Sequence, residues 1–168
     1  MTIDTLRHVP LFESLDDETA RKLCKLLQSI DCKAETSLFR TGDEGDAMYL
    51  IEQGKVRICV RTSDGRDMTL TELGRGDFFG EMALLDGQRR SADAIVAEDA
   101  RVAVLSREHF LSFLRSSPKV ALELLTALAN RLRHTDELLR RSATRNLNAP
   151  SGPGYPSCRC GTSLSTAR

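Results

Sequence analysis

The chain has 168 residues, which is enough for one domain with an extension and for a sizeable hydrophobic core. Its 24 basic and 24 acidic residues give a formal net charge of zero, whereas a nucleic-acid-binding chain usually carries a basic excess. No apolar run reaches the ~18 residues that a membrane-spanning helix needs, and the first residues lack the apolar core of a signal peptide. We therefore expect a soluble, cytoplasmic protein without a membrane span, and no direct DNA binding by this chain alone.

The first predicted element is a helix over residues 15–30. Ser14 lies just before this helix and Asp17 follows three residues later, the spacing of a capping box with Asp in place of Glu or Gln. Apolar residues recur on one face at helical spacing: Ala20, Leu23, Leu26, Leu27 and Ile30. That face must pack on another element, and the next ninety or so residues supply it.

Residues 31–106 change in texture to short alternating runs bounded by Gly and Asp. In one of them Val56, Ile58 and Val60 are expected on one face of a half-buried strand. Residues 63–65, Ser-Asp-Gly, predict a tight hairpin turn, and two further strands are expected over 93–97 and 101–105. Many short strands in sequence predict a mainly β fold with helices, an antiparallel β-roll of the jelly-roll type.

Helices return at residue 106, where Ser106 is expected to cap a helix over residues 107–115. Ser117 and Pro118 then begin a long helix that runs to about residue 146 and spans roughly 40–45 Å. Its apolar residues alternate in steps of three and four, as in a coiled-coil seam: Ala121, Leu125, Leu128, Leu132, Thr135 and Leu139. We expect a homodimer along this seam; the alternative is that the stripe folds back on the roll of its own subunit.

The predicted organisation is a roll with its N-terminal helix over residues 1–117, the long helix over 118–147 and a disordered tail over 148–168. Basic residues on the long helix could touch DNA or anionic lipid, although such a run is more often a solvated face: Arg131, Arg133, Arg140, Arg141 and Arg145. In the tail, Cys158 and Cys160 lack the further ligands of a metal site. No metal or cofactor is therefore expected.

The loop over residues 78–92 carries the chemistry. A cyclic phosphodiester is a compact anion attached to a ribose with one free hydroxyl. Gly80 lets the backbone approach closely, and a short helical turn over 82–85 can direct amide groups at the anion. Arg90 offers fork-shaped donors that match phosphate oxygens, and the carboxylate of Glu81 can accept a hydrogen bond from the ribose hydroxyl.

The loop sequence FGEMALLDGQRRSA resembles the phosphate-binding cassette of the cyclic nucleotide-binding domain family, which includes bacterial catabolite activators and regulatory subunits of cyclic AMP-dependent kinase. LFESLDDE and SLFRTGDEGDAMYLIEQGKVRI resemble its opening helix and its strand–turn–strand signature, so the resemblance covers about residues 11–140. It implies that Gly80 and Glu81 bind the ligand, Glu81 at the ribose 2′-hydroxyl. It also implies that Arg90 and Ser91 bind the phosphate, together with the amides of Met82 and Ala83.

The same resemblance places Thr135 where activators of this type contact the adenine amino group, and Asp136 where they reach the ligand of the partner subunit. Thr135 could equally be a tolerated polar residue of the seam. Some relatives that prefer guanine have threonine just after the phosphate arginine, where this chain has Ser91, so cyclic AMP is favoured over cyclic GMP. Arg89 departs from the proline that many relatives have, and it could compete with Arg90 for the anion.

These features predict a non-enzymatic sensor module that binds a cyclic nucleotide and signals through its C-terminal helix. The alternative is a Crp/Fnr-like transcription regulator that lacks, or is truncated before, its DNA-binding domain. A sugar-converting enzyme or dioxygenase on a similar roll would need clustered ligands, whereas the histidines are dispersed: His8, His109 and His134.

Overall fold

The computed structural model describes residues 1–13, 15–62 and 65–147, without the side chains of residues 138 and 141–147. The chain forms two compact units, Met1–Leu128 and Ala129–Arg168. The first unit contains the whole sheet and the helices around it, and the described part of the second is the continuation of the last helix. The predicted tail and its two cysteines lie outside the described residues.

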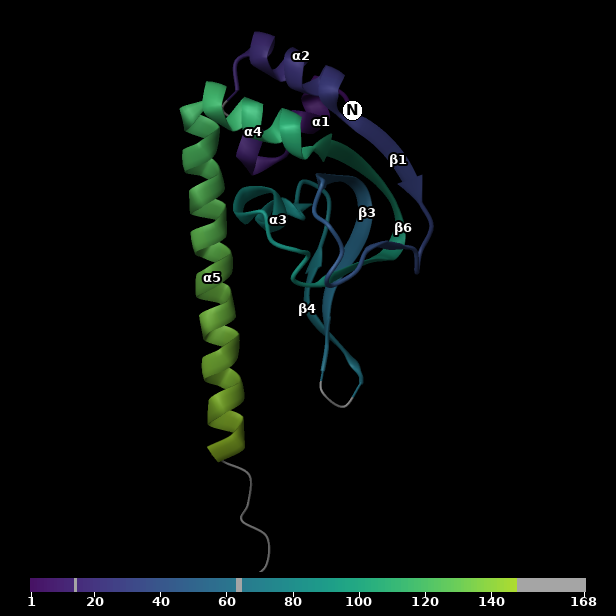
Figure 1. The fold of residues 1–168 in the computed structure, drawn as a ribbon, viewed down its shortest axis with the longest axis vertical. Helices are drawn as coiled ribbons and strands as arrows, with labels where there is room; N and C mark the ends of the chain where they lie inside the picture. The colour runs from purple at the N-terminus through teal and green to yellow at the C-terminus, as the bar shows by residue number, and fades with distance from the viewer. Residues whose placement is uncertain (14, 63–64, 148–168) are drawn as a thin grey trace, which may run out of the picture. The chain divides into compact units, whose positions relative to one another are not determined.

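Within the described residues, the first unit is built on an antiparallel six-stranded sheet. Its strands are β1 (Gln28–Cys32), β2 (Ser37–Phe39), β3 (Ala47–Arg61), β4 (Asp67–Leu73), β5 (Phe78–Phe79) and β6 (Asp93–Ser106). The main path is β1-β6-β3-β4, with β2 paired to β6 and β5 paired to β3. The long strands curl around one another (Figure 1), so the predicted antiparallel roll is confirmed.

The predicted helix over residues 15–30 is wrong at its C-terminal end. Helix α2 covers Asp17–Leu26, Leu27 is already extended, and β1 begins at Gln28. Ile30 instead pairs with Val102 of β6. The apolar residues of the predicted helix fit helical spacing, but for residues 28–30 hydrogen bonding to a sheet edge outweighs that local pattern. At the N-terminus, Asp16 accepts from the Thr19 amide at 2.9 Å and caps the helix, whereas Ser14 lies outside the described residues.

Two details of the strand prediction also change. Residues 93–106 form one continuous strand, not two, because the polar residues between the apolar runs stay paired to β1 and β3. The predicted common face of Val56, Ile58 and Val60 does not hold along its length. A register shift between Ile58 and Cys59 turns Cys59 inward, so that it is buried and Val60 is only partly covered. Of the predicted hairpin turn, only Gly65 lies among the described residues, with a φ of 80°.

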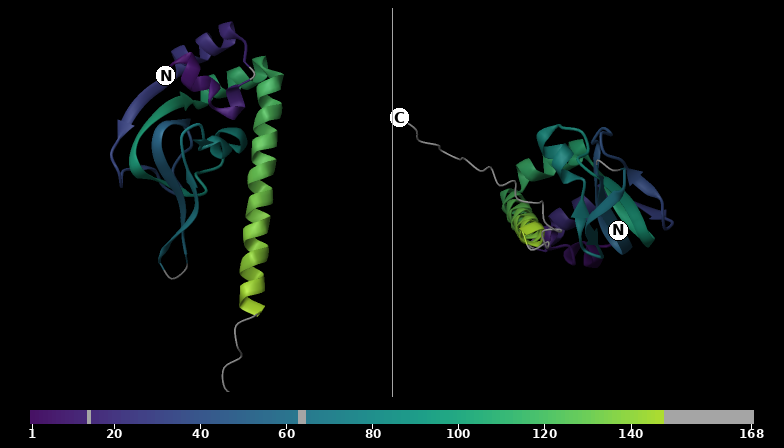
Figure 2. Two further views of the ribbon diagram at one scale, coloured as in Figure 1. Left: turned by 180° about the vertical axis from the view of Figure 1, so that it is seen from behind. Right: turned by 90° about the horizontal axis from the view of Figure 1, so that it is seen from below.

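Helices gather at one end of the roll (Figures 1 and 2). They are α1 (Ile3–Arg7), the 3₁₀ turn Pro10–Phe12, α2 and α4 (Arg107–Ser116). The amide of His109 donates to the Ser106 hydroxyl, so the predicted cap of α4 is confirmed. Their buried side chains form one core with Met48, Leu50 and Leu105 of the sheet. A second core, which includes Val56, fills the interior of the roll.

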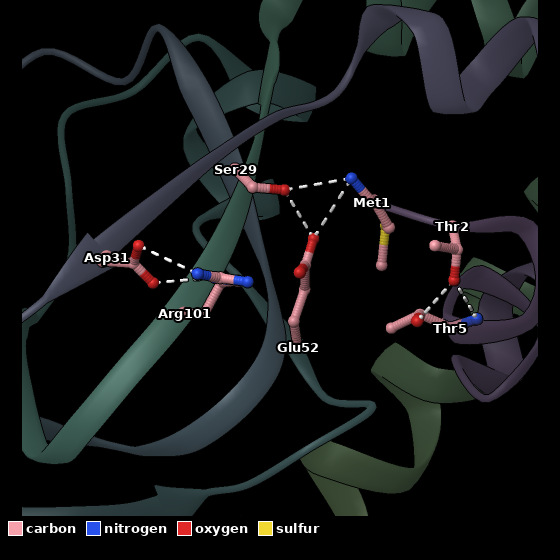
Figure 3. A network of polar contacts seen from close by, with 7 residues as sticks. All are labelled: Met1, Thr2, Thr5, Ser29, Asp31, Glu52 and Arg101. Carbon is pink, nitrogen blue, oxygen red and sulfur yellow. Dashed lines mark hydrogen bonds and ion pairs between the residues drawn. The ribbon is translucent and has the colours of Figure 1, made fainter.

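Polar contacts fasten the first residues to this sheet (Figure 3). The Ser29 hydroxyl of β1 donates to Glu52 of β3 at 2.7 Å, and the Met1 amino group lies 3.6 Å from the same carboxylate. Beside them, Arg101 of β6 donates to both oxygens of Asp31 on β1. Strands that are far apart in sequence are therefore joined by side chains as well as by backbone hydrogen bonds.

The last helix, α5, covers Pro118–Leu147 and has 30 residues, which agrees with the long helix predicted from residue 118 to about 146. Val120 and Leu124 in its first turns belong to the helical core of the first unit. Further along, Leu122, Leu125 and Leu132 are each more than 60% exposed. None of the described helices is long and apolar enough to cross a membrane.

Candidate functional site

The predicted cassette forms a short helix, α3 (Glu81–Asp86), between β5 and β6. It begins after Gly80, which has a φ of 82°, a left-handed conformation that favours glycine. A Cβ atom at Gly80 would also lie 2.7 Å from the guanidinium nitrogen Nη1 of Arg90. Both the backbone conformation and the lack of space therefore require glycine at this position, and the helical turn predicted over 82–85 is extended by one residue at each end.

Arg90 is the central side chain of the site and is only 4% exposed. Its Nη1 donates to the Gly80 carbonyl at 2.7 Å and its Nη2 donates to the Ala47 carbonyl at 2.6 Å. Its buried Nε has no hydrogen-bond partner among the described residues. A buried donor without a partner is costly, so this nitrogen marks a place where an acceptor would be stabilised.

The electrostatics around Arg90 favour an anion. Burial lowers the pKa of Arg90, while Tyr49 and the carboxylates of Asp46, Asp43 and Glu81 act in the opposite direction. An arginine stays protonated at any physiological pH, so the buried group keeps its charge. The Asp46 carboxylate lies 3.9 Å from Nη2, at the outer limit of an ion pair, and its side chain is 92% exposed. Most of the compensation for this buried cation must come from elsewhere.

Glu81 is the first residue of α3 and is 2% exposed. The structure thus brings the predicted residues Gly80, Glu81 and Arg90 together. Along the same segment, Ala83 is buried, whereas Met82 and Ser91 are exposed. A buried carboxylate near a buried arginine, with polar groups at the rim, suits a ligand that carries both an anion and a hydroxyl.

Thr135 and Asp136 lie on α5 in the second unit, and both side chains are exposed. The Thr135 hydroxyl donates to the Arg131 carbonyl one turn earlier, at 3.0 Å. Their contribution to a ligand site stays a prediction.

Contacts that sequence reasoning missed hold the cassette to the turn after β2. Arg89 donates through Nη1 to the Gly42 carbonyl at 2.8 Å. The Gly42 amide donates to the Arg90 carbonyl, and the Arg90 amide donates to the Asp43 carbonyl. In this structure Arg89 therefore binds the backbone of the turn. The sequence offered one hint, Gly42 at the start of the GDEGD turn, but its partner Arg89 lies 47 residues further along the chain.

The Arg90 side chain also lies against an aromatic cluster of Phe39, Tyr49 and Phe79. Its Cζ is 4.2 Å from the centre of the Phe39 ring and 5.9 Å from that of Tyr49. Sequence reasoning did not single out these rings, because alternating aromatic residues in strands are usually core.

As for metals, no group of three or more His, Cys, Asp or Glu side chains that could hold an ion is present in the described part of the chain.

Comparison with known proteins identifies this arrangement. The family model of the cyclic nucleotide-binding domain matches residues 30–117. The chain is 39% identical to the cyclic AMP receptor protein of Thermus thermophilus over 140 residues. This match covers 82% of this chain and 65% of that protein. The crystal structure of the Thermus thermophilus catabolite activator protein superposes with a TM-score of 0.72 at 39% identity, over 80% of this chain and 63% of that one.

A third relative is the N-terminal domain of a transcriptional regulator from Streptomyces coelicolor, with a TM-score of 0.64 and 33% identity over 81% of this chain and 95% of that one. The chain spans slightly less than two thirds of the Thermus thermophilus proteins and nearly all of this single domain. On its sequence, its fold and its cassette, the chain belongs to the cyclic nucleotide-binding domain family.

Proposed function

We propose that this chain is a regulatory module that binds cyclic AMP at the cassette and transmits binding to α5, without catalysing a reaction. The observation that carries the proposal is the buried Arg90 beside Gly80 and Glu81, whose Nε has no hydrogen-bond partner in the part of the chain that the structure describes. The cyclic phosphate would accept from Arg90 and from the Ser91 hydroxyl, and the ribose hydroxyl would donate to Glu81. The amides of Met82 and Ala83 complete the phosphate contacts in this proposal.

The test is calorimetry with cyclic AMP, cyclic GMP and cyclic di-GMP on the full chain and on Arg90→Leu. Loss of the charged donor from a buried site should weaken cyclic AMP binding by about 2–4 kcal/mol. The matched control is Arg21→Leu, which removes an exposed arginine of α2 and should leave affinity unchanged. Because Arg90 also satisfies two backbone carbonyls, Arg90→Lys and a thermal unfolding curve show whether the fold survives. A folded Arg90→Leu variant with wild-type affinity would contradict the proposed site.

The base is proposed to be adenine, read by Thr135 and Asp136 from α5. Both side chains can accept from an exocyclic amine, and neither alone separates adenine from guanine. We expect Thr135→Val to reduce the preference for cyclic AMP over cyclic GMP. Equal ratios of the two affinities in wild type and variant would contradict this role.

Transmission is supported by the packing of the cassette within the first unit. Leu84 of α3 is fully buried in the core that also contains Phe110 of α4 and Val120 of α5. Arg107 Nε donates to the Leu84 carbonyl at 3.2 Å, which adds a polar link between α4 and α3. A ligand that moves α3 would thereby favour one of two arrangements of α4 and α5. Amide NMR signals of residues 118–146 that stay unmoved at saturating cyclic AMP would exclude this route.

A second candidate is the regulatory part of a cyclic nucleotide-dependent transcription regulator. It is favoured by the similarity to the cyclic AMP receptor protein, of which the chain spans only 65%. On this proposal, the chain alone should not shift DNA in a ligand-dependent and salt-dependent way, whereas a longer protein that contains it should. We propose that both forms are homodimers through α5.

A further inference from the structure

Phe39 lies at the end of β2 and presents its ring to the Arg90 guanidinium. The Arg90 Cζ is 4.2 Å from the ring centre, well within the ~6 Å over which a cation is attracted to an aromatic face. Tyr49 is more distant, at 5.9 Å. The closest aromatic contact of the buried cation is therefore with a residue outside the cassette.

The same ring takes part in the close packing that shapes the start of α3. A Cβ atom at Gly80 would lie 3.4 Å from Phe39 Cε1 and 2.7 Å from Arg90 Nη1. The ring, the guanidinium and the Gly80 backbone thus share one small space. The Phe39 ring also lies 5.7 Å from Tyr49 and 5.9 Å from Phe79 between ring centres, so it belongs to a cluster of three aromatic side chains.

A ring face has a particular advantage beside an anion-binding arginine. A close carboxylate would stabilise the buried charge, but it would also occupy the N–H groups and repel a phosphate. An aromatic face stabilises the cation without accepting any N–H hydrogen bond in the guanidinium plane. Arg90 has five N–H donors, and backbone carbonyls take only two of its nitrogens. Its Nε has no hydrogen-bond partner among the described residues, so this donor is available while the charge is held in place.

We propose that Phe39 is the positioning residue for Arg90, because its ring holds the guanidinium at the place where the cyclic phosphate binds. This inference rests on the proposed function and adds to it a residue outside the cassette. Phe39 contacts the Arg90 guanidinium, and the role proposed for it is to position that group. Its contribution therefore depends on its π face, not only on its apolar volume.

The experiment compares Phe39→Leu, which keeps apolar bulk but removes the π face, with Phe39→Tyr and Phe39→Trp, which keep it. Cyclic AMP affinity, measured by calorimetry on the full chain, should fall about fivefold to thirtyfold in Phe39→Leu. It should stay within about threefold of wild type in the two aromatic variants. The matched control is Phe79→Leu, which removes a neighbouring ring of the same cluster and should have the smaller effect.

A second readout needs no ligand. Because the Phe39 ring lies over the Arg90 guanidinium, its ring current should influence the Arg90 Nε–H signal, which should move in Phe39→Leu and stay near its wild-type position in Phe39→Tyr. Thermal unfolding reports whether each variant folds, and Phe39→Met replaces Phe39→Leu if the latter does not.

The outcomes separate this inference from the proposed function. If wild type binds neither cyclic AMP nor cyclic GMP, the proposed function fails, and the Nε–H shift alone decides whether Phe39 holds the guanidinium. If wild type binds but a folded Phe39→Leu variant binds equally well, the inference fails and the proposed function stands. Equal losses in Phe39→Leu and Phe79→Leu would also overturn it, because they would indicate general packing.

Discussion

Arg89 and Arg90 are neighbours in sequence, yet the fold gives them different environments. Arg90 is buried against Phe39, whereas Arg89 is exposed and donates to the Gly42 carbonyl. The two residues point to different partners because the backbone here is anchored by hydrogen bonds between Arg90 and the turn at Gly42 and Asp43. The exposed arginine thus reinforces the attachment of the cassette to that turn.

Arg89→Met should lower the free energy of unfolding by about 0.5–1.5 kcal/mol, the usual net worth of one hydrogen bond. Because the lost contact holds the loop and not the anion, we expect cyclic AMP affinity to fall much less than in Arg90→Leu. Chemical denaturation and calorimetry measure the two effects. If Arg89→Met weakens binding as strongly as Arg90→Leu does, Arg89 contacts the phosphate directly and the role assigned here is wrong.

Among the elements, one carboxylate helps to hold the turn between β2 and β3 to the sheet. Asp93, the first residue of β6, accepts from the Thr41 amide at 2.6 Å and from the Thr41 hydroxyl at 2.8 Å. The amide hydrogen bond is the main reason that the pKa of Asp93 is lowered, and the hydroxyl adds to it. Its charged form therefore stabilises the folded state, through the turn that anchors Arg90.

The sign of the pH dependence follows from this direction. An unfolded aspartate has a pKa of about 3.9, and the folded value lies below it, so the stabilisation is fully present above about pH 4 and is lost as the pH falls through the folded pKa. Asp93→Ala should lower the free energy of unfolding by about 1–2 kcal/mol at pH 7. The difference from wild type should shrink as the pH falls below about 4.

Urea unfolding at several pH values measures this difference. Asp67→Ala, which removes an exposed carboxylate of β4, is the matched control and should show little loss at pH 7. A gap between wild type and Asp93→Ala that stays constant down to pH 2 would show that the carboxylate acts only through its shape.

Elements set by local chemistry could be predicted from the sequence, and elements set by distant pairing could not. The sequence predicts the start of α4 at Ser106, because the hydroxyl that caps the helix acts on an amide only three residues away. The start of β1 depends on pairing with β6, 70 residues further on in the case of Asp31 and Arg101. Local helical spacing gave no sign of this pairing.

The same distinction divides the site. Gly80, Glu81 and Arg90 could be grouped because one loop carries them all. The ring of Phe39 and the carbonyl of Ala47 reach Arg90 only through the pairing of β2 with β6 and of β3 with β5. Such partners become visible only once the strand register is known.

At the scale of the whole molecule, α5 exposes several leucine side chains. Leu122, Leu125 and Leu132 are 65%, 62% and 64% exposed. Leu125 and Leu132 are seven residues apart and belong to the predicted seam, whereas Leu122 lies off it. A heptad pair of exposed leucines is typical of a coiled-coil interface, which agrees with the proposed homodimer.

We therefore expect sedimentation equilibrium to give twice the chain mass for wild type and a lower mass for Leu132→Glu, because a buried glutamate in the seam of a dimer carries a large desolvation cost. Leu122→Glu introduces the same charge at an equally exposed leucine off the seam, so it should weaken the dimer much less.

If both variants remain dimeric, the subunits associate through another surface. If wild type is a monomer at every concentration, the stripe has a different partner and transmission through α5 must operate within one chain. If only Leu132→Glu dissociates, cyclic AMP titrations on that monomer can then measure whether binding at the cassette needs the second subunit.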